Sequence, residues 1–113
     1  MASVTASGTS FRVDDLAHAK SFWARFRGLM LRRELPAGAG LAIEPCGSIH
    51  MLFMRFPIDA VFYNRDGEVT AVARNVRPWL GIARGRGKTR GVIELPAGSA
   101  GDLSAGAQLT FEP

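Results

Sequence analysis

Cysteine is nearly absent from this chain of 113 residues, in which Cys46 is the only example. A single thiol cannot close a disulfide within the chain, and it cannot supply the paired sulfur ligands of most structural zinc sites. The sequence therefore argues against a disulfide-stabilised secreted scaffold. We expect a cytoplasmic protein and predict neither a metal site nor a cofactor.

Long hydrophobic runs are also missing. Nowhere do about eighteen apolar residues follow one another, although a membrane-spanning helix needs a run of roughly that length. The first residues, from Met1 to Ser10, are small and polar and lack the basic and apolar regions of a signal peptide. The sequence thus predicts neither a signal peptide nor a membrane partner.

Acidic residues are absent from residues 72–91, which carry six basic side chains, whereas the net charge of the whole chain is +4. Basic side chains spaced by glycines can contact phosphates, and an indole such as Trp79 can stack on a base. The alternative interpretation is a solvated loop, which is favoured because strand-binding proteins usually stack several bases. The polyanion-binding candidates are Arg84, Arg86, Lys88 and Arg90.

What the chain does have is the composition of an ordinary globular domain, with 47% hydrophobic and 21% charged residues. Its length suits one domain with one core. Residues 1–9 are small and polar, so we expect them to form a flexible arm. Residues 10–113 are then expected to form the single domain.

The N-terminal third predicts one main helix over about residues 15–27. Asp14 and Asp15 suit a helix start, and Gly28 suits its end. At 100° per residue the large apolar side chains fall on one stripe, which predicts a helix packed across a sheet. The stripe consists of Leu16, Ala19, Phe22, Trp23, Phe26 and Met30.

After Gly40 the apolar residues occur in short runs that are typical of strands. The clearest signal is a hairpin in which residues 58–63 and 68–73 flank the turn Asn64-Arg65-Asp66-Gly67. Further strands are expected at residues 10–13, 41–44, 48–54, 91–95 and 108–111. Together with the helix they predict a compact α+β domain, with a bent antiparallel sheet or small open barrel and one main helix near the N-terminus.

Four sequence blocks, taken in order, resemble domain-of-unknown-function family 192, which is widespread in prokaryotes. The blocks are Arg27–Met30, Phe53–Phe62, Arg77–Trp79 and Val92–Gly98. The resemblance covers about residues 14–112. Phe53 replaces the tryptophan of the family pattern and the spacer between Met54 and Asp59 is short, so the chain resembles a divergent branch. The resemblance implies a compact, mainly β domain with a helix, and it implies no activity.

Two carboxylates interrupt apolar strands. Burial of Asp59 would be costly unless its carboxylate is hydrogen bonded, and both a structural ion pair and a ligand-orienting role are open. Its candidate ion-pair partners are Arg55, Arg74 and Arg77. Glu94 repeats the pattern, and it either turns inward as a second buried carboxylate or faces water.

Cys46, His50 and Asp59 together suggest a thiol enzyme, since a thiolate nucleophile needs a base and the base needs an orienting group. Residues four apart in an extended strand are about 13 Å apart. Cys46 and His50 therefore meet only if residues 45–47 turn the chain back. The expected role of Cys46 is a structural thiol.

The sequence thus predicts a small soluble binding or accessory domain with a shallow site near His50, Asp59 and the basic residues 74–90. Its partner is expected to be an unidentified small molecule or anion. The ligand-binding candidates are His50, Asp59, Arg55, Trp79, Arg77 and Glu94. Two alternatives stay open: a nucleic-acid-binding accessory protein, and a hydrolase or thiol enzyme that uses Cys46 and His50. No catalytic residue is assigned.

Overall fold

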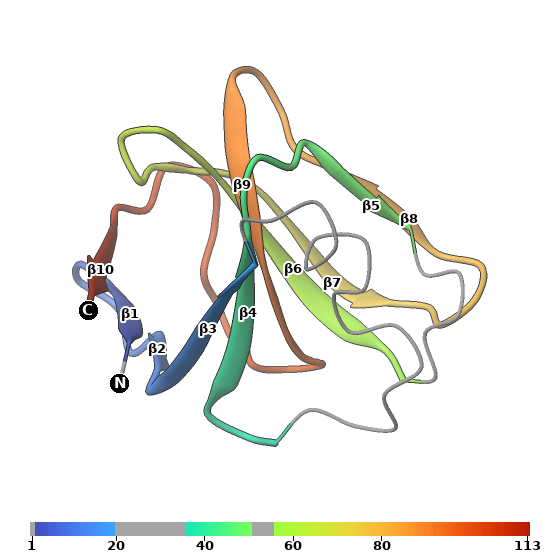
Figure 1. Ribbon diagram of the computed structural model, residues 1–113, viewed down its shortest axis with the longest axis horizontal. Coiled ribbons are helices and arrows are strands. Elements are labelled where there is room, and N and C mark those ends of the chain that lie inside the picture. The colour runs from blue at the N-terminus through green and yellow to red at the C-terminus, as the bar shows by residue number, and fades with distance from the viewer. Residues whose placement is uncertain (1, 20–35, 51–55) are drawn as a thin grey trace.

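The computed structural model describes residues 2–19, 36–50 and 56–113 of the chain (Figure 1). These residues contain ten strands and no helix. The strands are β1 (Ser3–Ala6), β2 (Arg12–Val13), β3 (Asp15–Ala19), β4 (Ala39–Ile43), β5 (Ser48–His50), β6 (Ile58–Asn64), β7 (Val69–Val76), β8 (Ile82–Arg84), β9 (Thr89–Pro96) and β10 (Leu109–Glu112).

The strands form three sheets. The central sheet has five strands in the order β3-β4-β9-β6-β7. A three-stranded sheet, β10-β1-β2, lies on one side of it and the pair β5-β8 on the other (Figure 1). All pairings are antiparallel except that of β3 with β4. No helix long and apolar enough to cross a membrane is found in this part of the chain.

The predicted α+β class is wrong for the residues that the structure describes, which are all β. Residues 15–19, the start of the predicted helix, form β3 instead, and β3 pairs in parallel with β4. Backbone pairing with β4 outweighs the helical spacing of the apolar residues, because local propensity is weak beside tertiary context. The rest of the predicted helix, with Trp23 and Phe26, lies outside the described residues.

The predicted small barrel is not closed. Closure would require β3 to pair with β7. These two strands instead form the two edges of the central sheet. The hairpin prediction, by contrast, is confirmed: β6 and β7 pair antiparallel around the turn at residues 64–67. Gly67 has a φ of +81° there, a conformation that a residue without Cβ adopts at little cost.

Residues 1–9 were expected to form a flexible arm, yet they contain β1 between β10 and β2. The Val4 side chain is fully buried and lies opposite Val13 and Phe111. The polar composition of this segment did not reveal that partners distant in sequence would cover it.

Two hydrophobic clusters cover the two faces of the central sheet, because successive residues of a strand point to opposite faces. The first cluster includes Val61 and Ile93 with Val4 and Leu109 of the three-stranded sheet. The second includes Ala60, Phe62 and Val92 with Ile49 and Ala83 of the β5-β8 pair. β6 and β9 are therefore buried on both faces.

Candidate functional site

Asp59 lies in β6 and is almost fully buried, with 1% of its surface exposed. Its Oδ1 accepts a hydrogen bond from the Asn75 amide at 2.9 Å, and its Oδ2 accepts hydrogen bonds from the amides of Gly98 and Ala100 at 3.0 and 2.9 Å. Both carboxylate oxygens are thus occupied by backbone donors. Asp59 fastens the end of β7 and the turn after β9 to the middle of the sheet.

The two described arginines considered as partners of Asp59, Arg74 and Arg77, form no ion pair with it. Arg74 donates hydrogen bonds to the backbone carbonyls of Gly101 and Leu103. Arg77 is exposed on the loop after β7, and Arg55 lies outside the described residues. Among the described residues the partners of Asp59 are thus backbone amides and not an arginine, whereas the ligand-orienting role stays a hypothesis.

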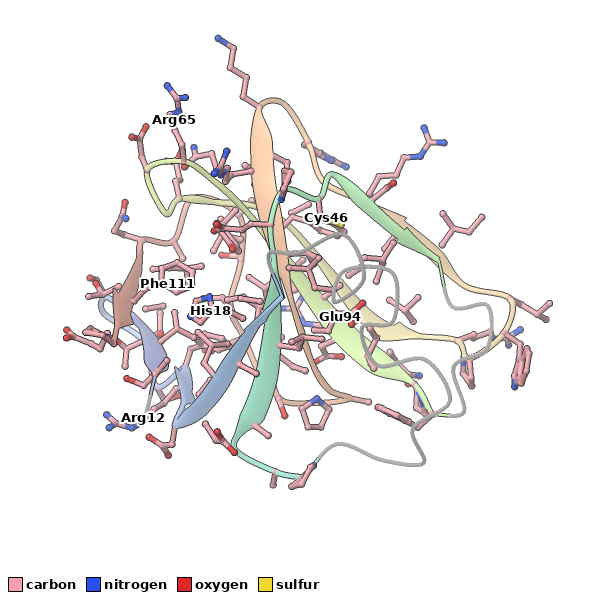
Figure 2. All side chains as sticks on the ribbon, viewed as in Figure 1. Arg12, His18, Cys46, Arg65, Glu94 and Phe111 are labelled. Atoms are coloured by element: carbon pink, nitrogen blue, oxygen red, sulfur yellow. The ribbon has the colours of Figure 1, made fainter. Side chains whose placement is uncertain are left out.

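Glu94 lies in the second half of β9 (Figure 2). It is 6% exposed, so of the two open interpretations the inward one is observed. Burial raises the pKa of its carboxyl from 4.5 to about 7, because a charged group loses its hydration in the interior. Its Oε1 has no hydrogen-bond partner within the described part of the chain.

Cys46 lies half-buried between β4 and β5, where its thiol donates a hydrogen bond to the Ser48 carbonyl at 3.0 Å. His50 ends β5 opposite Ile82, and its side chain is not among those described. The thiol-enzyme hypothesis therefore gains no geometric support here and stays a hypothesis.

Cys46→Ser is expected to retain the fold and any ligand binding, because a serine hydroxyl can donate the same hydrogen bond to the Ser48 carbonyl. Thiol labelling of the native protein at about pH 6 should be slow, since an ordinary thiol is almost fully protonated there. Rapid stoichiometric labelling at that pH would contradict a structural role and favour the thiol enzyme.

The basic segment, residues 74–90, spans the end of β7, all of β8 and the start of β9. Arg84 lies in β8 opposite Ser48, and Trp79, which is 48% exposed, lies on the loop between β7 and β8. Lys88 and Arg90 flank Thr89, the first residue of β9, whose hydroxyl donates a 2.8 Å hydrogen bond to the Arg86 carbonyl. Of the four polyanion-binding candidates, Lys88 and Arg90 line the cavities near the start of β9, and Arg84 and Arg86 do not.

Two adjoining cavities lie where the β6-β7 turn meets the start of β9, and we call them the rim site. The outer cavity has a volume of about 550 Å³ and is lined by Asn64, Arg65, Asp66, Lys88, Thr89 and Arg90. The inner cavity has a volume of about 470 Å³ and adds Glu44, Tyr63, Gly67, Leu109 and Phe111 to residues 64–66 and Arg90. Figure 2 shows Arg65 at the tip of the hairpin, and the outer cavity places it near the start of β9.

The inner wall of the rim site is built across three strands. The Tyr63 hydroxyl, from β6, donates a 2.6 Å hydrogen bond to Oε2 of Glu44, which follows β4. Gly91 of β9 makes this contact possible, since a Cβ there would lie 2.7 Å from both the Glu44 Cγ and the Tyr63 Oη. Burial and the neighbouring Glu44 raise the pKa of Tyr63, so the phenol stays protonated and keeps donating.

The charge of the outer cavity is positive. Arg65, Lys88 and Arg90 line it with a single carboxylate, that of Asp66. Arg90 lies 3.9 Å from Oε1 of Glu44, whereas neither Arg65 nor Lys88 forms an ion pair within the part of the chain that is described. No group of three or more metal-binding side chains gathers among the same residues. The arrangement suits an anion.

Sequence reasoning missed Glu44, Tyr63 and Arg65 as site residues. The turn that carries Arg65 was predicted, but the pairing that sets Asn64 opposite Thr89 was not. That register places the hairpin tip beside Lys88 and Arg90, and no local sequence pattern predicts the register.

Comparison with known proteins assigns the chain to a family. The family model DUF192, described as "Uncharacterized ACR, COG1430", matches residues 2–111. The chain belongs to this family. A curated relative, a UPF0127 protein from Thermococcus sibiricus, is 36% identical over 95 residues, which cover 77% of this chain and 58% of the relative. The match thus spans less than two thirds of the length of that relative.

Two crystal structures are similar in fold to this chain. A protein of unknown function from Novosphingobium aromaticivorans superposes with a TM-score of 0.84 at 27% identity, covering 96% of this chain and 83% of that one. A "putative transcription regulator" from Sinorhizobium meliloti gives a TM-score of 0.85 at 24% identity, covering 97% and 92%. At that identity the second similarity supports the fold alone. The resemblance inferred from the four sequence blocks is confirmed.

Proposed function

We propose that this DUF192 domain is a binding module that holds a small anionic ligand at the rim site. One observation carries the proposal: Arg65, Lys88 and Arg90 line one cavity with a single opposing carboxylate. Guanidinium groups present planar pairs of N–H donors that match phosphate and carboxylate oxygens, and an ammonium adds a point charge.

The two cavities suggest what kind of anion fits. Exposed ion pairs contribute only about 0.2–1 kcal/mol each, so three of them give roughly 3 kcal/mol at most. A dissociation constant of 1 mM already needs about 4 kcal/mol. The remainder has to come from further contacts in the inner cavity, whose lining is more polar than apolar and includes Tyr63, Asn64 and Phe111. The proposed ligand is a small molecule with an anionic head in the outer cavity and a partly polar body in the inner one.

Titration with inorganic pyrophosphate tests the anion subsite, because this probe carries the proposed head group and no body. Because the head group alone is expected to bind more weakly than about 1 mM, pyrophosphate is added at concentrations well above that value. We then expect it to raise the thermal unfolding midpoint of the full chain, since a ligand that binds only the native state stabilises it. The variant Arg65→Ala/Lys88→Ala should lose this effect.

The chain offers a matched control, Arg84→Ala/Arg86→Ala, which removes the same number of exposed charges outside both cavities. This control should keep the response to pyrophosphate. An absent response in the parent, or an equal loss in both double variants, would contradict a rim site. Binding of labelled single-stranded DNA or RNA that depends on Arg84 and Arg86 would instead favour the nucleic-acid alternative.

A further inference from the structure

Three large apolar side chains are exposed around the start of β8. Trp79 and Leu80, in the loop between β7 and β8, are 48% and 80% exposed, and Ile82 is 71% exposed. No other large hydrophobic side chain of the described ranges is exposed. Figure 1 shows this loop and the β5-β8 pair on the side of the molecule opposite the three-stranded sheet. Exposed apolar side chains that gather in one place are typical of interaction surfaces.

The loop that carries Trp79 and Leu80 is a tight turn. The Gly81 amide donates a hydrogen bond to the Arg77 carbonyl at 3.0 Å, and a Cβ on Gly81 would lie 2.6 Å from that carbonyl oxygen. Trp79 has a φ of +67°, which is strained for a bulky residue and persists only where surrounding contacts hold it. The turn therefore presents Leu80 to solvent in a defined conformation.

β8 is an edge strand, and in the described part of the chain its only strand partner is β5. The ladder continues at Gly85, directly after β8, whose amide donates a 2.8 Å hydrogen bond to the Gly47 carbonyl. Along an antiparallel strand, successive residues direct their N–H and C=O groups to opposite sides. Arg84 and Ile82, one and three positions before Gly85, therefore direct these groups away from β5. An unpaired edge of this kind can accept a further strand.

The charge along this edge has one sign. Arg84 shares the outer face of β8 with Ile82, because the residue between them points inward. Arg77 and Arg86 are exposed on either side of β8, and residues 72–91 contain no aspartate or glutamate. A second copy of the chain would place arginines against arginines at this edge, which is unfavourable, whereas an acidic partner is complementary.

We propose that β8 is a docking edge for an extended segment of a partner protein that is rich in both acidic and apolar residues. The segment adds as a strand, and its backbone pairs with the outward N–H and C=O groups of Ile82 and Arg84. Its apolar side chains cover Leu80 and Ile82, and its carboxylates pair with Arg84 and Arg86. A lipid surface or a nucleic acid would leave the strand edge unpaired. The docking edge lies outside both cavities of the rim site and does not depend on that site.

A synthetic peptide of this chemistry tests the proposal. The probe is fluorescein-labelled and about eight residues long, which is within the usual length of a strand. Leucine and glutamate alternate along one face of it, and threonine occupies the other. Fluorescence anisotropy with the full chain should show saturable binding. Leu80→Ser/Ile82→Ser should weaken this binding about tenfold, and the two substitutions lie at exposed positions that the fold does not depend on.

Two comparisons distinguish strand addition from attraction between charges. Only one edge of the peptide strand faces β8, so N-methylation of one alternate set of its amides should abolish binding and N-methylation of the other set should not. Arg84→Glu/Arg86→Glu should lose the glutamate peptide and gain binding of the same peptide with lysine in place of glutamate.

The control Arg65→Ala/Lys88→Ala removes two charges from the rim site and should bind the peptide as the parent does. Peptide binding and the response to pyrophosphate can therefore fail separately. No saturable peptide binding, or an equal effect of the two methylated sets, would overturn the proposal. Binding of phosphatidylserine vesicles or single-stranded DNA that Leu80→Ser/Ile82→Ser abolishes, in a protein that does not bind the peptide, would also overturn it.

Discussion

Asp59→Ala is expected to lower the free energy of unfolding by about 3–5 kcal/mol. The substitution removes the acceptor for the amides of Asn75, Gly98 and Ala100, and each buried donor left unpaired costs about 1–3 kcal/mol. The expected loss is smaller than three full penalties because only the Ala100 hydrogen bond is fully buried. The hydrogen bonds of Asn75 and Gly98 are partly buried, so water can reach their amides after the substitution. Urea unfolding with linear extrapolation measures the change.

Asp102→Ala is the matched control for Asp59→Ala. Asp102 is exposed on the segment that follows Ala100, and a surface substitution of this kind usually changes stability by less than about 0.5 kcal/mol. If Asp59→Ala unfolds at the same urea concentration as Asp102→Ala, Asp59 does not fasten the two turns to the sheet.

Glu94→Gln is expected to stabilise the protein at about pH 8 and to remove part of its pH dependence. The pKa of Glu94 is raised from 4.5 to about 7 in the folded state, so the folded state binds the proton more tightly than the unfolded state does. The stability linked to this group is therefore complete below about pH 4.5 and is lost as the pH rises through 7. At 1.36 kcal/mol per pKa unit the loss is about 3 kcal/mol.

Urea unfolding of Glu94→Gln and the parent from about pH 4 to 8 measures this difference. The two proteins should differ least at low pH and most at about pH 8, where the glutamine variant is more stable. Glu112→Gln should follow the parent throughout. A glutamine variant that is less stable than the parent at about pH 8 would mean that the ionised carboxylate is satisfied in the folded protein.

The sequence was informative where a local pattern is enough to specify structure. The turn at residues 64–67 combines asparagine, aspartate and glycine, and these residues form the predicted hairpin through contacts within a few positions. The cost of burying Asp59 likewise predicted that its carboxylate would be hydrogen bonded, and three amides provide those bonds. The sequence could not say that the donors would come from residues 75, 98 and 100.

The class of the N-terminal third was predicted wrongly for a physical reason. Apolar residues at positions 16 and 19 fit both a helical stripe and a short strand, so their spacing alone does not distinguish the two. Parallel pairing of β3 with β4 supplies backbone hydrogen bonds from a strand distant in sequence. Such pairing leaves no periodic signal in β3 itself.

The rim site was not predicted because it depends on the register in which β6 pairs with β9. Arg65 directly follows β6 and Lys88 directly precedes β9, and this pairing makes them neighbours. Composition had drawn attention to the whole segment 74–90, of which only the last part contributes to the cavities.

The most direct test of the anion-binding claim is an amide NMR titration of the full chain with pyrophosphate. We expect saturable shifts concentrated at residues 64–67 and 88–90, which line the outer cavity or adjoin it. In Arg65→Ala/Lys88→Ala these shifts should disappear. Shifts that spread over residues 77–86 instead, or no saturable shifts at all, would contradict the account.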